Sequence, residues 1–166
     1  MERSLFVGVG ANLTTSCHGP PIGACRWAIN RFVSISNVAI ECISAFYGSA
    51  PIPASDQPDF VNAVVKLSSS IEPAAFLSLL HAIESEAGRV RSEVNAARVL
   101  DLDLLAVDDL IYPGPELVLP HPRMHERAFV LFPFCDIAPG WRHPTLALTA
   151  AELRDRLSPQ RIERLP

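Results

Sequence analysis

Two carboxylates lie close together in one apolar stretch of the chain. Residues 98–107 run Arg-Val-Leu-Asp-Leu-Asp-Leu-Leu-Ala-Val, and the apolar positions around Asp101 and Asp103 are typical of a central β-strand. Alternate residues of a strand point to the same face, so the two carboxylates are expected on one face, with Cα atoms ~6.5–7 Å apart. Mg²⁺ would relieve their mutual repulsion and could also bind phosphate oxygens. The alternative is a strand with two acids facing solvent.

Three arginines, Arg89, Arg91 and Arg98, precede the two aspartates. Guanidinium groups bind phosphate and neutralise the charge that develops during phosphoryl transfer. Arginines beside a carboxylate pair therefore favour a site for a nucleoside triphosphate, although three solvated surface arginines would give the same pattern. The chain has no Gly-x-x-x-x-Gly-Lys-Ser/Thr motif and no kinase-type glycine loop, which argues against the P-loop and protein kinase classes.

Length and composition indicate one globular domain spanning residues 1–166, because 49% of the residues are hydrophobic and 19% are charged. The net charge is −4 and there is no basic run, so nucleic-acid binding is not expected. The apolar run near the N-terminus is too short and too rich in glycine for a signal peptide or a membrane span. The 4 cysteines form no CxxC pair, which favours reduced, mostly buried thiols in a cytoplasmic protein. Nothing demands more than a monomer.

Hydrophobic periodicity and turn residues predict the elements that must position these side chains. Strands are expected at 5–11, 38–47, 60–67 and 98–107, with helices at 22–34, 73–87, 126–136 and 150–157, a short strand at 110–112 and a long proline-rich loop at 48–59. The order β-α-β-β-α-β predicts an α+β fold, a ferredoxin-like split βαβ sandwich with a C-terminal helical extension. The first strand and the strand of Asp101 are then expected near each other. Gly8 and Gly10 share one face of the first strand and would allow close approach there.

Seven segments, in this order and spacing, resemble one known family. They are Val9-Gly10-Ala11-Asn12-Leu13, Ser44-Ala45-Phe46-Tyr47, Asp56-Gln57-Pro58-Asp59-Phe60-Val61-Asn62-Ala63, Ile83-Glu84 with Gly88-Arg89-Val90-Arg91, Arg98-Val99-Leu100-Asp101-Leu102-Asp103, Leu119-Pro120-His121-Pro122-Arg123-Met124, and Glu126-Arg127-Ala128-Phe129-Val130-Leu131. Each segment is weak alone, but together they resemble the 6-hydroxymethyl-7,8-dihydropterin pyrophosphokinases of folate biosynthesis. The resemblance covers about residues 5–153.

The resemblance implies a reaction and a role for each site residue. The family transfers the pyrophosphoryl group of ATP to the hydroxymethyl oxygen of a reduced pterin, releases AMP, and uses two Mg²⁺ ions. The metal ligands and catalytic aspartates would be Asp101 and Asp103, with Arg89 and Arg98 as the catalytic arginines. Further contacts to ATP would come from Glu84, Arg91, Leu104, His121 and Arg127. The pterin would contact Ser49, Ala50, Ile52, Phe60, Asn62 and Phe129, with the aromatic rings stacking on its faces and Asn62 bonding its edge.

Without the resemblance, several of these residues have ordinary structural interpretations. Phe129 would be a core residue of an apolar helix, Asn62 a turn or strand-edge residue, and His121 a loop histidine between two prolines. The four remaining histidines are expected at the surface or in helices; they are His18, His81, His125 and His143.

The chain also departs from the family at the loop before Arg98. The family usually carries Arg-Trp-Gly-Pro there, whereas this chain has Val94-Asn95-Ala96-Ala97, and the loop is expected to be one residue shorter. Ala50 stands where the family commonly has proline. Three explanations remain: an active enzyme whose lid works differently, a variant acting on a related pterin in a methanopterin-type pathway, or a paralogue that binds nucleotide or pterin without turnover. Outside the family, a ligand-binding regulatory module would need no paired acids, and a metal-dependent hydrolase would want a third carboxylate.

Overall fold

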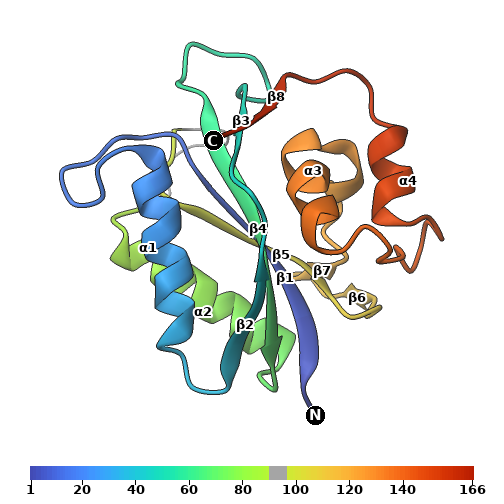
Figure 1. Cartoon of the computed structure of the whole chain (residues 1–166). Coiled ribbons are helices and arrows are strands. Elements are labelled where there is room, and N and C mark those ends of the chain that lie inside the picture. Colours follow the sequence, from blue (N-terminus) through green and yellow to red (C-terminus); the bar gives the residue numbers. More distant parts are fainter. Residues whose placement is uncertain (90–96) are drawn as a thin grey trace.

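The computed structural model describes residues 1–89 and 97–166, and the elements are drawn in Figure 1. The strands are β1 (Arg3–Ala11), β2 (Val38–Ile43), β3 (Tyr47–Ser49), β4 (Phe60–Ser69), β5 (Asp101–Val107), β6 (Tyr112–Pro113), β7 (Val118–Leu119) and β8 (Ile162–Arg164). The helices are α1 (Pro21–Val33), α2 (Pro73–Glu86), the 3₁₀ helix η1 (Met124–Glu126), α3 (Ala128–Ile137) and α4 (Ala150–Asp155).

The main sheet is antiparallel, with strand order β5-β1-β4-β3-β8 and with β2 also paired to β4. This order confirms the predicted split βαβ arrangement, in which β1 and the aspartate strand β5 are direct neighbours. Helices α1 and α2 cover one face of the sheet, and α3 with α4 lies on the other (Figure 1). The C-terminal helical extension therefore forms a third layer.

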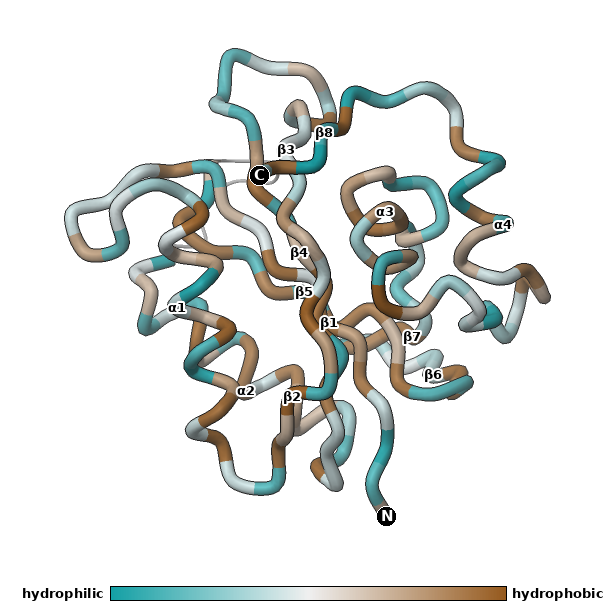
Figure 2. Tube along the Cα trace, in the orientation of Figure 1, coloured by the Kyte–Doolittle hydropathy of each residue, from teal (hydrophilic) through white to brown (hydrophobic). Residues whose placement is uncertain are grey.

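The two faces of β1 are filled differently, because its side chains alternate between the two helical layers. Leu5, Val7 and Val9 belong to the larger core beneath α1 and α2, and Phe6 belongs to the smaller core beneath α3. Both cores appear as the brown, hydrophobic centre of Figure 2. On the α3 side, Gly8 and Gly10 leave the sheet without side chains at the end of β1, and β5 places its two aspartates opposite them.

Several elements differ from the predictions. The strand expected at 38–47 is divided into β2 and β3, and Ser49, expected in the loop, ends β3. The chain forms a β6–β7 hairpin where only a short strand at 110–112 was expected, and β8 had no sequence signal. His143, expected at the surface or in a helix, is buried outside any helix, because its Nδ1 accepts hydrogen bonds from the N–H groups of Thr145 and Leu146.

Two further predictions concern cysteines and membranes. All 4 cysteines are free; Cys25 and Cys135 are buried, whereas Cys17 and Cys42 are exposed. Across 1–89 and 97–166, none of the helices combines the length and hydrophobicity needed to traverse a bilayer.

Candidate active site

Asp101 and Asp103 point to the same face of β5, as the strand periodicity predicts. Asp101 pairs with Gly10 and Asp103 with Gly8 in the β1–β5 ladder, and both line a shallow cavity that reaches Phe129 of α3. Burial and the charge of Asp101 raise the pKa of the Asp103 carboxyl to about 7. Within the described residues, no ion pair reaches Asp103, whereas Asp101 has two.

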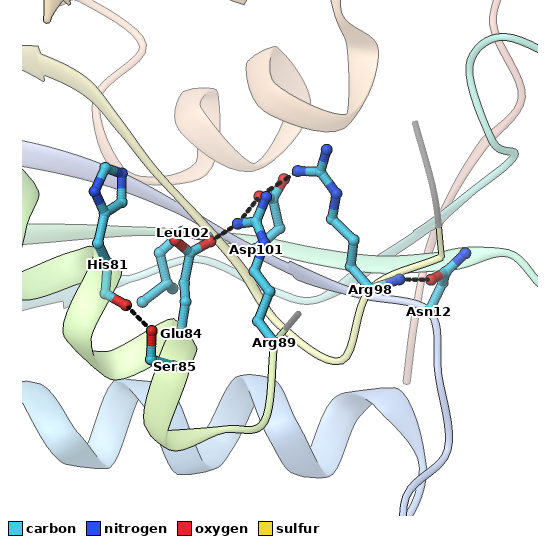
Figure 3. A network of polar contacts seen from close by, with 8 residues as sticks. All are labelled: Asn12, His81, Glu84, Ser85, Arg89, Arg98, Asp101 and Leu102. Atoms are coloured by element: carbon cyan, nitrogen blue, oxygen red, sulfur yellow. Dashed lines mark hydrogen bonds and ion pairs between the residues drawn. The ribbon is translucent and has the colours of Figure 1, made fainter. Parts of the chain in front are cut away.

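Both ion pairs of Asp101 come from predicted arginines, as Figure 3 shows. The Nη1 atoms of Arg89 and Arg98 lie 3.0 and 2.7 Å from Asp101 Oδ1. Both arginines therefore contact the same carboxylate oxygen, which holds the two guanidinium groups next to each other. Arg91 lies outside the described residues, as do Val94, Asn95 and Ala96 of the predicted shortened lid.

Arg89 is positioned by the end of α2. Gly88 adopts φ = +95°, a conformation that favours glycine, and the Arg89 N–H then donates to the Glu84 carbonyl at 3.1 Å. This turn folds the Arg89 guanidinium over the Glu84 carboxylate, with which it forms a hydrogen bond and ion pair. Glu84 also accepts a hydrogen bond from the Leu102 N–H at 3.0 Å and is only 1% exposed. The Glu84 side chain therefore lies beneath Arg89 and joins α2 to β5.

Arg98 is held by Asn12, a buried residue at the end of β1. The Asn12 N–H donates to the Arg98 carbonyl at 3.0 Å, and the Arg98 N–H donates to Asn12 Oδ1 at 2.8 Å. Asn12 Nδ2 donates in turn to Gln57 Oε1 and to the Pro58 carbonyl, both at 3.1 Å. One amide side chain thus connects the arginine segment to the proline-rich loop. Asn12 belongs to a segment quoted for the resemblance, but its type alone did not predict this role.

A cavity of about 110 Å³ opens beside Asp101, between the proline-rich loop and α3. Its lining brings together most of the predicted substrate and phosphate residues; they are Ser49, Ala50, Ile52, Phe60, Asn62, Arg98, Asp101, Arg127 and Phe129. Asn62 Nδ2 donates to Ser49 Oγ at 2.8 Å, and the Arg127 guanidinium lies 5.3 Å from the Phe129 ring centroid. The lining also includes Gly10, Pro51, Pro53 and Gln57, which were not predicted as site residues.

Gly10 forms part of the cavity floor because it has no side chain. A Cβ atom at this position would lie 2.9 Å from Asn62 Oδ1, which is too close. The glycine therefore allows the Asn62 amide to lie across β1. The sequence indicated close approach at this glycine, but not which group approaches.

Four predicted nucleotide contacts do not line this cavity: Glu84 and Arg89, which are described above, and Leu104 and His121. Leu104 points to the opposite face of β5 and is buried in the core beneath α1 and α2, so its side chain does not reach the cavity. His121 lies in the segment after β7, where its N–H donates to the Leu105 carbonyl at 2.7 Å and its Nδ1 accepts from the Arg123 N–H at 3.1 Å. Burial and the charge of Arg127 lower the pKa of His121 to about 4, so the imidazole is neutral at pH 7.

The donor set of the aspartate pair fits Mg²⁺. Within the described ranges, no group of three or more His, Cys, Asp or Glu side chains could hold a metal ion. The chain therefore offers the two carboxylates, and a metal here would need water and substrate oxygens for its other ligands. Mg²⁺ binds in this way, using one or two carboxylates together with phosphate oxygens.

The fold and the site define an enzyme that binds a phosphorylated substrate beside an aromatic pocket. A family model, 7,8-dihydro-6-hydroxymethylpterin-pyrophosphokinase, matches residues 6–139. The chain belongs to this family, and it is a pyrophosphokinase. The family resemblance proposed from the sequence is thus confirmed.

Two curated relatives are similar to this chain over most of their length. The 2-amino-4-hydroxy-6-hydroxymethyldihydropteridine pyrophosphokinase of Pseudomonas aeruginosa is 36% identical over 166 residues, covering 100% of this chain and 99% of that protein. The Haemophilus influenzae protein of the same name is 38% identical over 133 residues, 80% of each chain. Among solved structures, wild-type Plasmodium falciparum HPPK-DHPS with pteroate has a TM-score of 0.70 at 12% identity. That alignment covers 94% of this chain and 42% of the Plasmodium chain, and it supports the fold alone.

Proposed function

We propose that this chain transfers the pyrophosphoryl group of ATP to the hydroxymethyl oxygen of 6-hydroxymethyl-7,8-dihydropterin, a step of folate biosynthesis. The observation that carries the proposal is the pair Asp101 and Asp103 on one face of β5, with Arg89 and Arg98 beside them and an aromatic pocket next to them. Family membership supports the same reaction.

Asp101 and Asp103 hold two Mg²⁺ ions in this proposal, and the ions, when bound, neutralise phosphate charge. Arg89 and Arg98 bind the triphosphate beside the two aspartates, and Arg127 approaches it from the N-terminus of α3. Because Asp101 and Glu84 already fix these arginines, little rearrangement is needed when charge develops on the transferred group. The role of Arg91 stays a prediction.

Phe60 and Phe129 enclose the pterin ring, and Asn62 bonds its polar edge, with Ser49, Ala50 and Ile52 completing the pocket wall. Asn62 is oriented by its bond to Ser49, so its carbonyl oxygen remains available to a pterin N–H. The hydroxymethyl oxygen then attacks the β-phosphorus in line; the new O–P bond forms as the bond to the α-phosphate oxygen breaks, and AMP leaves. The hydroxyl proton passes to solvent. Monomeric state, cytoplasmic location and single-domain organisation stay predictions.

The test is AMP release from Mg·ATP with and without 6-hydroxymethyl-7,8-dihydropterin. We expect AMP formation only with the pterin, and we expect Asp101→Ala and Asp103→Ala to abolish it. Asp109→Ala is the matched control, because Asp109 follows the same strand but lies in an exposed turn. Binding without AMP would favour a related pterin substrate or a non-catalytic paralogue. Full turnover by either site variant would refute the metal assignment.

A further inference from the structure

The segment at residues 160–165 contacts the start of α3 and strand β3, two elements that carry residues of the substrate cavity or lead directly into them. We propose that Gln160 and β8 act as a clamp, here called the C-terminal clamp, that positions the cavity residues Arg127, Phe129 and Ser49. This inference rests on the proposed function for the identity of the substrate. The clamp lies outside the segment matched by the family model, which ends at residue 139.

Gln160 caps the helix that carries two cavity residues. Helix α3 begins at Ala128, and the side chain of Arg127, at the N-cap position, makes no capping hydrogen bond. Gln160 Oε1 instead accepts from the Ala128 N–H at 3.0 Å, and Gln160 Nε2 donates to the Glu126 carbonyl at 2.9 Å. The first N–H groups of a helix lack partners within the helix, so a side chain from 32 residues away in sequence satisfies one of them.

These two bonds flank Arg127 on both sides. Because the amide of Gln160 bonds the residue before and the residue after it, the backbone of Arg127 is fixed relative to β8. Arg127 and Phe129 both line the cavity, and their side chains contact each other. Loss of the Gln160 bonds would therefore loosen both side chains together.

Strand β8 holds the opposite wall. It pairs with β3, so that Ser49 lies opposite Ile162 and Tyr47 opposite Arg164, and the Leu165 N–H extends the contact to the Phe46 carbonyl at 2.8 Å. Ser49 is the residue that orients Asn62, and the cavity residues Ala50–Pro53 follow it directly. The segment that caps α3 is thus continuous with the strand that fixes the substrate loop.

A third contact of this segment provides a control. Arg161 Nη2 lies 2.6 Å from Asp59 Oδ1, but their side chains are 67% and 52% exposed. Exposed ion pairs contribute little to stability. Replacing Arg161 therefore changes the same segment without removing the cap on α3. Among the described residues that line the cavity, none comes from the clamp, so Gln160 is a positioning residue.

The experiment compares Gln160→Met, Gln160→Glu and Arg161→Met in the full chain by AMP release. Met keeps the length of the side chain but makes neither hydrogen bond, and we expect pterin KM to rise about tenfold with kcat changed by less than about twofold. Glu keeps the acceptor for the Ala128 N–H and suits a helix N-terminus, but it places a carboxylate oxygen against the Glu126 carbonyl, so it should recover only part of that loss. Arg161→Met should leave pterin KM within about twofold of wild type.

Hydrogen exchange measures the cap independently of activity. The Ala128 amide should exchange about tenfold faster in Gln160→Met than in wild type, whereas the Leu153 amide of α4 should not change. The inference would be overturned if Gln160→Met left the exchange rate of the Ala128 amide unchanged. It would also be overturned if wild type were active and Gln160→Met left the pterin KM unchanged. An equal rise in KM for Arg161→Met would also overturn it, because it would indicate a general effect of the segment. Wild type without pterin-dependent AMP release would instead overturn the proposed function.

Discussion

Replacing Asp103 with Asn should stabilise the metal-free protein while abolishing its activity. The native carboxyl has a pKa raised to about 7 by burial and by the charge of Asp101, against an ordinary value of 3.8. A carboxyl whose pKa is higher in the folded state binds more protons there than in the unfolded chain. Stability is therefore lost as the pH rises from about 4 through about 7, and the loss is complete above that range.

The size of the expected stabilisation follows from the pKa shift of Asp103. About three pKa units correspond to about 4 kcal/mol in the free energy of unfolding, which is an upper bound. Because Asp103 retains some solvent exposure, screening reduces the expected effect to about 1–3 kcal/mol. Asparagine has nearly the same shape and no charge, so Asp103→Asn should recover this amount at pH 8 and less than half of it at pH 5.

Urea unfolding in EDTA measures the free energy of unfolding of wild type and of Asp103→Asn at pH 5 and at pH 8. Asp109→Asn is the control for a charge change in an exposed turn. Added Mg²⁺ should stabilise the wild type more than Asp103→Asn, because the variant has lost one carboxylate. If Asp103→Asn were no more stable than wild type at pH 8, the reasoning would be refuted. A gain of the same size at both pH values would show that ionisation of the buried Asp103 carboxyl is not its cause.

Three other predictions concern the surrounding residues. Glu84→Gln keeps an acceptor for the Leu102 N–H but loses the charge beneath Arg89. We therefore expect kcat/KM to fall about 10–100-fold in steady-state kinetics and the free energy of unfolding to fall by about 1–3 kcal/mol in urea. His121 has a pKa lowered to about 4, so as the pH falls the unfolded chain binds a proton at this residue before the folded chain does. Wild type should therefore lose about 1–2 kcal/mol in the free energy of unfolding from this group between pH 7 and pH 5, whereas His121→Asn should not. Thermal melts of both proteins at the two pH values measure the difference. Asn62→Ala should raise pterin KM about tenfold or more with ATP KM within about twofold, and an equal rise in both would exclude a pterin-specific role.

The sequence was sufficient to predict the aspartate pair, because the two-residue period of a strand determines which side chains share a face. It also predicted the order of the main elements and the position of α2, which was expected at 73–87 and is found at Pro73–Glu86. The division of 38–47 into β2 and β3 was not predictable, because the break contains no glycine or proline and the apolar residues Ala45 and Phe46 lie within it. The burial of Glu84 depends on which face of β5 meets α2, which periodicity does not specify, whereas the direction of Leu104, opposite to the two aspartates, does follow from the strand period. The roles of Asn12 and Gln160 depend on single hydrogen bonds between distant segments, which leave no local pattern.

The missing side chain of Gly10 limits how this protein can be improved by selection for stability. Replacing a strand glycine with alanine restricts the unfolded chain and commonly stabilises a protein by about 0.4–1 kcal/mol. At position 10, the added methyl group would displace the Asn62 amide, because its carbon would lie only 2.9 Å from Asn62 Oδ1. The gain from restricting the unfolded chain would therefore be offset by the disturbed hydrogen bond between Asn62 and Ser49. Position 10 is thus a site where the usual stabilising exchange of glycine for alanine would displace Asn62, the proposed pterin contact.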